Sequence, residues 1–255
     1  MVSGHWTTMK EQNIYDNQTF FDGYRKLREN PFSANIVIEK PALFSLCPDL
    51  HGQSVLDLGC GYGENCREFA EMGAKHIVGI DISKKMLEIA KEENSLENIE
   101  YINMSMSELH KLNGSFHTIF SSLAFHYIEN LDKLLTDIYN LLENDGLLIF
   151  SQEHPLSTAL KQKLLWSRNA NGDILHYNLT HYGDSGQRST EWIVNNVVKY
   201  HRSFSDIFNA LISTKFIIEK VLEPIPDPEI MKKVPAYQKN IHKPDFLLLK
   251  TRKSI

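Results

Sequence analysis

Residues 54–63 read Ser-Val-Leu-Asp-Leu-Gly-Cys-Gly-Tyr-Gly, and this stretch decides how the rest of the chain is interpreted. Its apolar start predicts a buried strand, and the helix-like residues 64–70 follow the glycines directly. A glycine turn between a strand and a helix leaves backbone N–H groups facing a ligand at the carboxyl edge of a sheet. The spacing G-x-G-x-G is one residue shorter than the dinucleotide fingerprint, and Asp57 beside the turn would repel a diphosphate. The stretch therefore predicts a site for a nucleotide-like ligand that carries a cation, such as an amino-acid ammonium group.

A second strand and a second helix follow this turn. Residues 76–81 form a short apolar run ending in Asp81, and residues 83–93 carry apolar side chains at helical spacing. In such a βαβ unit, a carboxylate at the tip of the second strand accepts hydrogen bonds from the hydroxyls of a ribose. Asp81 alone would also suit a helix cap ahead of Ser83. Its place after the glycine turn favours ribose recognition.

The passage from Val55 through Met86 and Leu87 resembles the class I S-adenosylmethionine (SAM)-dependent methyltransferases. It is similar in particular to the small-molecule enzymes of ubiquinone and biotin biosynthesis, and the resemblance covers about residues 40–150. It implies SAM as the cofactor. The cofactor contacts that it implies come from the glycine turn, the tip of the second strand and the following helix, namely Asp57, Gly59, Cys60, Gly61, Asp81, Ile82 and Met86.

Two later segments extend this resemblance. Where related enzymes place an Asp-Ala turn against adenine, this chain has a serine for the acid, in Ser105-Met106-Ser107. The resemblance therefore assigns Met106 and Ser107 to adenine through backbone N–H groups and a hydroxyl. Residues 121–128 resemble the family segment whose start borders the methionine part of SAM, which assigns Ser122 to the cofactor.

Strands and helices continue to alternate along the chain. Apolar runs predict further strands at residues 99–104, 117–122, 146–151, 216–222 and 245–250, and helices at 131–142 and 204–213. This alternation predicts an α/β fold with a Rossmann-like, doubly wound, mostly parallel seven-stranded sheet. The family resemblance implies that the last strand is antiparallel. We expect residues 1–255 to form one domain.

Residues 153–194 interrupt the alternation with a polar, aromatic stretch. The stretch is too long for an ordinary connection and too aromatic for a disordered one. We therefore expect a cap inserted after the fifth strand, whose aromatic side chains form a small core of their own or line a substrate pocket.

The N-terminal residues 1–32 include an aromatic and basic segment. Tyr15, Phe20, Phe21 and Tyr24 have the spacing of the apolar face of a helix packed on the domain, and a lid over SAM is the alternative. We expect Tyr24 and Arg28 to contact the cofactor. Arg25 or Arg28 would pair with the methionine carboxylate, although both would also suit a solvated helix face.

Two histidines follow strands at the edge where ligands gather in an open α/β sheet. His126 lies beyond the fourth strand and His154 beyond the fifth. A sulfonium methyl is already activated, so a methyltransferase has to align a nucleophile, exclude water and remove a proton where one is held. His126 and His154 are the candidate bases or substrate-orienting groups, because an imidazole titrates near physiological pH.

Composition narrows the kind of partner. The chain of 255 residues is 42% hydrophobic, has a net charge of −5 and carries no basic stripe, so neither nucleic acid nor a membrane is expected as a partner. No run of 18 apolar residues or signal peptide occurs, and three cysteines without metal spacing suit reduced thiols. A cytoplasmic enzyme without a metal is expected, as a monomer or homodimer.

The sequence favours a SAM-dependent methyltransferase acting on a small cyclic or aromatic metabolite. A SAM-binding sensor or assembly partner without catalysis is the alternative from another class. A Rossmann-type NAD oxidoreductase is disfavoured by the glycine spacing and by Asp57.

Overall fold

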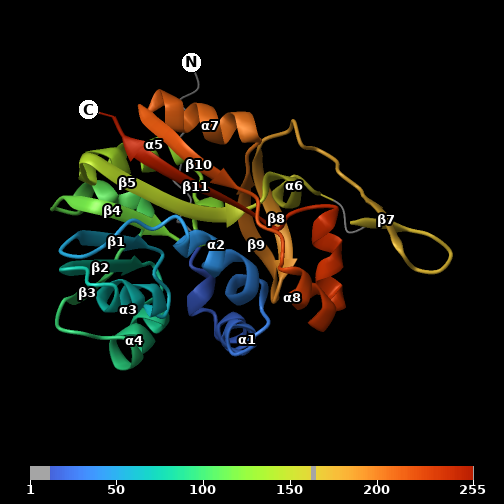
Figure 1. The fold of residues 1–255 in the computed structure, drawn as a ribbon, viewed down its shortest axis with the longest axis horizontal. Helices are drawn as coiled ribbons and strands as arrows, with labels where there is room; N and C mark the ends of the chain where they lie inside the picture. Colours follow the sequence, from blue (N-terminus) through green and yellow to red (C-terminus); the bar gives the residue numbers. More distant parts are fainter. Residues whose placement is uncertain (1–11, 162–164, 255) are drawn as a thin grey trace, which may run out of the picture.

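The computed structural model describes residues 12–161 and 165–254. A seven-stranded sheet in the order β10-β11-β5-β4-β1-β2-β3 forms its centre (Figure 1). Strands β1 to β5 pair in parallel, and β11 lies antiparallel between β5 and β10. The predicted Rossmann-like, mostly parallel sheet is confirmed. Its strands are β1 (Ser54–Leu58), β2 (His76–Asp81), β3 (Ile99–Asn103), β4 (Phe116–Ser121), β5 (Leu142–Glu153), β10 (Phe216–Leu222) and β11 (Phe246–Lys253).

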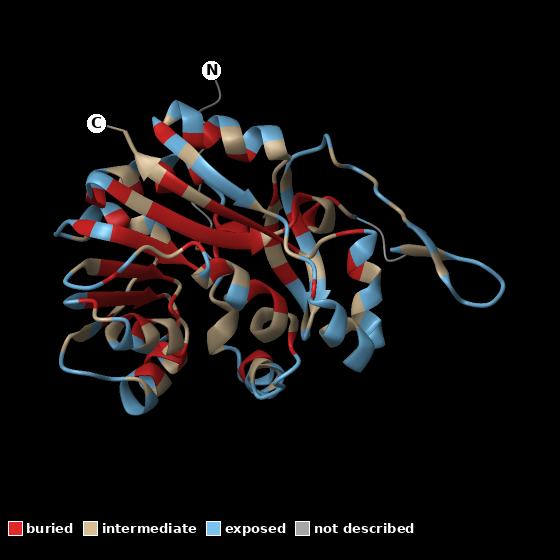
Figure 2. Ribbon diagram, viewed as in Figure 1, coloured by how far each residue is buried: buried red, intermediate tan, exposed pale blue. Residues whose placement is uncertain are grey.

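Helices cover both faces of this sheet because its central strands are apolar on both sides. Val55 packs in the core beneath α2 (Lys40–Phe44), α3 (Glu64–Glu71) and α4 (Lys84–Glu93). Its neighbour Leu56 packs in the opposite core, against α5 (Leu131–Leu141) and α7 (Phe204–Ser213). Figure 2 shows the central strands buried between these layers. Continuous apolar runs of this kind are expected for parallel strands buried on both faces.

The chain reverses direction across the sheet at β1. It runs from β1 outward through β2 and β3, and then returns to pair β4 against the other side of β1. In open α/β sheets, ligands bind in the crevice beyond the carboxyl ends of the strands at such a reversal. The glycine turn and the end of β4 therefore lie at the position where a ligand is expected.

The segment after β5 leaves the sheet. It comprises α6 (Pro155–Thr158) and two antiparallel hairpins, formed by β6 (Trp166–Arg168) with β7 (Ile174–Tyr177) and by β8 (Gly186–Trp192) with β9 (Val194–His201). These elements end at His201, whereas the sequence predicts that the insertion ends at Val194. The difference arises because residues 194–201 form the second strand of a hairpin, with Val197, Lys199 and His201 buried in alternation. The loop beside β7 projects from the body and is largely exposed (Figures 1 and 2).

Short helices lie at both ends of the described chain. On the N-terminal side these are η1 (Ile14–Asp16), α1 (Gln18–Arg28) and η2 (Asn35–Glu39). Near the C-terminus, α8 (Pro228–Lys233) and η5 (Pro235–Ile241) lie within a proline-rich stretch where only a surface excursion is predicted. Asp227 caps α8 by accepting a hydrogen bond from the backbone N–H of Glu229 at 2.8 Å. Within residues 12–161 and 165–254, no helix is long and apolar enough to cross a membrane.

Candidate functional site

A cavity of about 330 Å³ lies beyond the carboxyl ends of the central strands. Its walls come from the glycine turn, the ends of β2, β4 and β5, the N-terminal helices and the tip of the β8–β9 hairpin. Ten of the predicted cofactor residues line it, namely Tyr24, Arg28, Gly59, Cys60, Gly61, Asp81, Ile82, Met86, Met106 and Ser122. His126 lines it as well.

The glycine turn has a shape that other residues adopt at a cost. Gly59 and Gly61 have φ values of 73° and 54°, in the left-handed region that glycine enters without penalty. The backbone N–H groups of Gly59 and Cys60 donate to the Ile80 carbonyl at 2.9 and 3.0 Å, which fixes the turn against β2. No atom lies within 4 Å of the position where a side chain at Gly61 would begin. The turn therefore leaves open space on the side of the cavity.

Asp81 closes the cavity at the end of β2. One carboxylate oxygen accepts the Gly61 N–H at 2.9 Å, and the other accepts the Ser83 N–H at 2.8 Å. Burial raises the pKa of Asp81 to about 6, and these two backbone donors oppose the rise. Each oxygen keeps a free lone pair. Asp81 can therefore accept further hydrogen bonds from ligand hydroxyls while it holds the turn.

Asp57 lies beneath the turn and does not line the cavity. Its Oδ2 accepts a hydrogen bond from the Cys66 thiol at 3.5 Å, and no described residue donates to its Oδ1. Burial raises the pKa of Asp57 to about 7. A buried acceptor without a donor is costly, so Asp57 Oδ1 is suited to accept a hydrogen bond from a water that a ligand ammonium group binds in turn.

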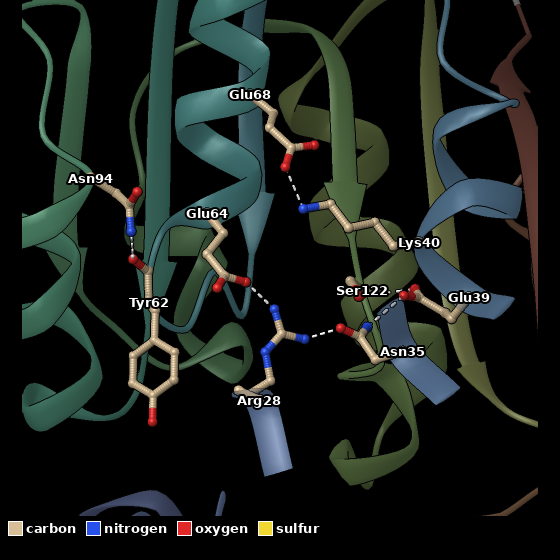
Figure 3. Close-up of polar contacts among 9 residues, drawn as sticks. All are labelled: Arg28, Asn35, Glu39, Lys40, Tyr62, Glu64, Glu68, Asn94 and Ser122. Carbon is tan, nitrogen blue, oxygen red and sulfur yellow. Dashed lines mark hydrogen bonds and ion pairs between the residues drawn. The ribbon is translucent and has the colours of Figure 1, made fainter. Parts of the chain in front are cut away.

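A polar network joins the N-terminal helices to this edge of the sheet. Figure 3 shows Arg28, from the end of α1, between Glu64 of α3 and Asn35 of η2, and it contacts both. Asn35 donates to Glu39 at 2.6 Å, and the Ser122 hydroxyl donates to the same carboxylate at 2.9 Å. Arg28 thus reaches the cavity, but its guanidinium already has an anionic partner.

Aromatic side chains of the N-terminal segment, of the segment after β4 and of the β8–β9 hairpin form one wall of the cavity. The Tyr15 ring lies edge-on to Tyr127 at 6.2 Å, and Trp192 lies edge-on to Tyr24 at 6.0 Å. Phe20, fully buried, contacts Tyr15 and Trp192 with centroid distances of 5.0 and 5.3 Å. The N-terminal segment and the β8–β9 hairpin therefore meet over the cavity through aromatic contacts.

The two predicted histidines have different environments. His126 lines the cavity, and its Nδ1 accepts the Glu153 N–H at 3.3 Å. Burial lowers the pKa of His126 to about 4, and the neighbouring Glu153 carboxylate opposes this shift. The ring is therefore neutral at physiological pH with its proton on Nε2, so that this nitrogen is a hydrogen-bond donor and not a base.

His154 is fully buried and does not line the cavity. Its Nε2 lies 2.7 Å from the Glu223 carboxylate, and its Nδ1 accepts the Leu156 N–H at the start of α6. Both ring nitrogens are occupied in holding α6 and the segment after β10 together. The position past a strand end, which motivated the prediction, does not place this side chain at the site.

Of the remaining predicted residues, Ser107 is exposed on η3 (Met106–Lys111) and does not line the cavity, whereas Met106 does. Sequence reasoning missed several side chains that line the cavity, among them Asn35, Glu64 and Glu153, whereas Trp192 belongs to the insert aromatics predicted to form a small core or to line a substrate pocket. Glu153 directly precedes His154, so the end of the fifth strand was the available signal. Asn35 comes from a distant segment that no local pattern connects to the glycine turn.

Comparison with known proteins identifies the family. Residues 55–146 match the family described as "Methyltransferase domain". The crystal structure of an S-adenosylmethionine-dependent methyltransferase from Mesorhizobium loti is 34% identical in sequence, with a TM-score of 0.79 over 89% of this chain and 99% of that chain. The chain belongs to the class I SAM-dependent methyltransferases. The methyltransferase is also 38% identical to an uncharacterized protein of Haemophilus influenzae over 251 residues, which cover 94% of this chain and 97% of that protein.

A shorter match is to an enzyme whose name states its methyl acceptor. The malonyl-[acyl-carrier protein] O-methyltransferase of Bacillus cereus is 30% identical over 98 residues, which are 38% of this chain and 36% of that enzyme. The acceptor named for the Bacillus enzyme is a property of that enzyme alone.

SAM is the cofactor of this methyltransferase, and its residues fit that ligand. The turn leaves open space at Gly61, Asp81 has free acceptor lone pairs, and Asp57 keeps an oxygen without a donor. These are the features that a nucleoside bearing an amino-acid group requires.

Proposed function

We propose that this enzyme methylates a small cyclic or aromatic metabolite held inside the cavity. The observation that carries the proposal is the aromatic wall formed by Tyr15, Tyr127 and Trp192 on one side of the cavity, whose whole volume is about 330 Å³. Small-molecule sites are concave and mostly apolar, with few polar groups. A groove for nucleic acid would need a basic surface, whereas the chain has a net charge of −5. We also propose that the enzyme is cytoplasmic and acts as a monomer or homodimer.

We propose the following division of the cofactor contacts. Gly59, Cys60 and Gly61 face the nucleoside with their backbone, and Asp81 accepts hydrogen bonds from the ribose hydroxyls. Ser122 serves the methionine end together with Tyr24 and Arg28 from α1, and Asp57, beneath the turn, acts there through a bound water. Ile82, Met86 and Met106 pack around adenine, and Ser107 remains a weaker candidate because it is exposed. When bound, SAM supplies a methyl group already activated by the sulfonium.

The residues around the acceptor chiefly align it and exclude water. His126 presents an Nε2–H donor, so we propose that it orients the acceptor and does not remove its proton. The aromatic wall shields the reacting atoms from solvent. His154 supports the cap from outside the cavity and has no proposed contact with the acceptor.

A screen for methyl acceptors tests this proposal. Release of S-adenosylhomocysteine (SAH) is measured with phenols, heteroaromatic amines and small acids, and in parallel with RNA and with a mixture of folded proteins. We expect turnover with members of the small-molecule set alone. SAH release confined to RNA or protein would contradict the proposed acceptor class.

We also propose that α1 acts as a lid over SAM. Tyr24, Leu27 and Arg28 of α1 line the cavity, so a bound cofactor would lie against this helix. Residues 1–11 of the predicted lid segment lie outside the described residues. If the helix must open for SAH to leave, amide exchange over residues 20–28 should slow about tenfold at SAH concentrations tenfold above Kd. Exchange in α5, on the far face of the sheet, serves as the control, and equal slowing of both helices or no slowing of α1 would contradict the lid.

A further inference from the structure

The two ends of the cavity are separated by the strand order. Asp81 ends β2 and Glu153 ends β5, and β1 and β4 lie between them. Three strand spacings place the two carboxylates roughly 14 Å apart across the sheet. With the ribose at Asp81, as the proposed function has it, Glu153 lies at the end left for the methyl acceptor.

One carboxylate oxygen of Glu153 accepts a hydrogen bond from a described residue, and the other accepts none. The Lys199 ammonium from β9 donates to Oε1 at 2.5 Å, and no described residue donates to Oε2. Burial alone would raise the pKa of Glu153, but the Lys199 ammonium that donates to it holds it below its usual value. The group that faces the cavity is therefore an ionised carboxylate with free lone pairs.

Lys199 lies behind this carboxylate and does not line the cavity. Its side chain is 7% exposed, and its ammonium lies 5.1 Å from the Trp192 ring centroid and 5.9 Å from that of Tyr127. These rings, whose faces attract cations, hold the lysine in place. A ligand in the cavity consequently meets the carboxylate and the rings before it meets the ammonium.

The charges that line the cavity are mostly negative. Glu64, Asp81 and Glu153 face it as carboxylates, and Arg28, the one arginine or lysine among the described lining residues, is already paired with Glu64. An anionic acceptor would therefore lie near Glu153 without a free cation to balance it. A cationic or N–H-bearing acceptor would find a charged hydrogen-bond acceptor beside aromatic rings.

We propose that Glu153 is the specificity-determining residue for the methyl acceptor, and that it selects an aromatic compound bearing an amine. Its free oxygen accepts a hydrogen bond from the amine while the ring packs against Trp192 and Tyr127. Lys199 positions the carboxylate from behind. This inference rests on the proposed function, because it assigns the acceptor to the end of the cavity opposite Asp81.

The test uses three probes of one shape and different charge. Binding of benzylamine, benzyl alcohol and benzoate to the SAH-loaded full-length protein is measured by ligand-observed NMR titration at neutral pH. We expect benzylamine to bind about tenfold more tightly than benzyl alcohol, as one charge-assisted hydrogen bond implies, and benzoate to bind most weakly. If the wild-type protein bound the three probes with equal affinity, or bound benzoate most tightly, the inference would be overturned.

Glu153→Gln should remove the preference for benzylamine over benzyl alcohol while SAH affinity stays within about twofold. Glu129→Gln is the matched control, because Glu129 is exposed in the segment after β4 and does not line the cavity. A benzylamine preference that persists in Glu153→Gln would overturn the assignment. Failure of the wild-type protein to bind SAH would contradict the cofactor site itself. Normal SAH binding with equal affinities for the three probes would contradict only the role of Glu153.

Discussion

Replacing Asp81 by alanine is expected to weaken SAH binding by about tenfold to a hundredfold. Asp81 is 9% exposed, lines the cavity and accepts the Gly61 N–H at 2.9 Å, so its carboxylate both holds the turn and remains available to a ribose. Losing a charge-assisted hydrogen bond costs about 1.5–3 kcal/mol, which corresponds to that range of affinity. Isothermal titration calorimetry with SAH measures the change directly.

The matched control for this variant is Asp16→Asn. Asp16 lies beside the same loop and accepts hydrogen bonds from the Ser83 hydroxyl at 2.6 Å and the Lys85 N–H at 3.3 Å, but it does not line the cavity. We expect its SAH affinity to stay within about twofold of wild type. Unchanged affinity in a folded Asp81→Ala protein would remove the ribose assignment.

The pH dependence of binding follows from the same group. Because burial raises the pKa of Asp81 to about 6, the carboxylate is ionised at pH 7.5 and largely protonated at pH 5. The pKa of Asp81 is higher in the folded protein than in the unfolded chain. Its contribution to the free energy of unfolding is therefore fully present below the unfolded pKa and is lost as the pH rises through about 6. SAH affinity should therefore fall on acidification even as the penalty for burying Asp81 diminishes.

The central part of the fold was predictable because its signals are local. The turn of residues 59–63 requires positive φ, which glycine supplies, and each apolar run before it or after it matches one buried strand of a parallel sheet. The same locality explains why the glycines, Asp81 and Met86 line the cavity as predicted. The turn, strand and helix that hold them are contiguous in sequence.

The acceptor end depends on contacts between distant segments. Glu153 and Lys199 are 46 residues apart, and the partner of His154 is Glu223, 69 residues away. A histidine after a strand indicates a ligand edge only if its side chain turns toward the cavity, and here Glu223 and the start of α6 hold His154 away from it. Sequence periodicity carries no information on such pairings, so tertiary contacts decided which histidine reaches the cavity.

Gly61→Leu is expected to lower SAH affinity at least a hundredfold while the protein still folds. Gly61 lines the cavity, and a side chain built there meets no protein atom within 4 Å, so it would extend into the space that the cofactor needs. A non-glycine residue at its φ of 54° costs about 1–2 kcal/mol, which a domain of ordinary stability tolerates. Calorimetry with SAH and a thermal melt separate the loss of binding from the loss of stability.

Gly52→Leu isolates the backbone strain from the loss of cofactor space. Gly52 also has a positive φ, 72°, and also has no atom within 4 Å of its would-be side chain, but it is exposed in the turn before β1 and does not line the cavity. Both variants should lose similar stability, since both place leucine in the left-handed region. Only Gly61→Leu should lose SAH binding. If Gly61→Leu bound SAH as tightly as Gly52→Leu does, the open space at the turn would not be the cofactor site.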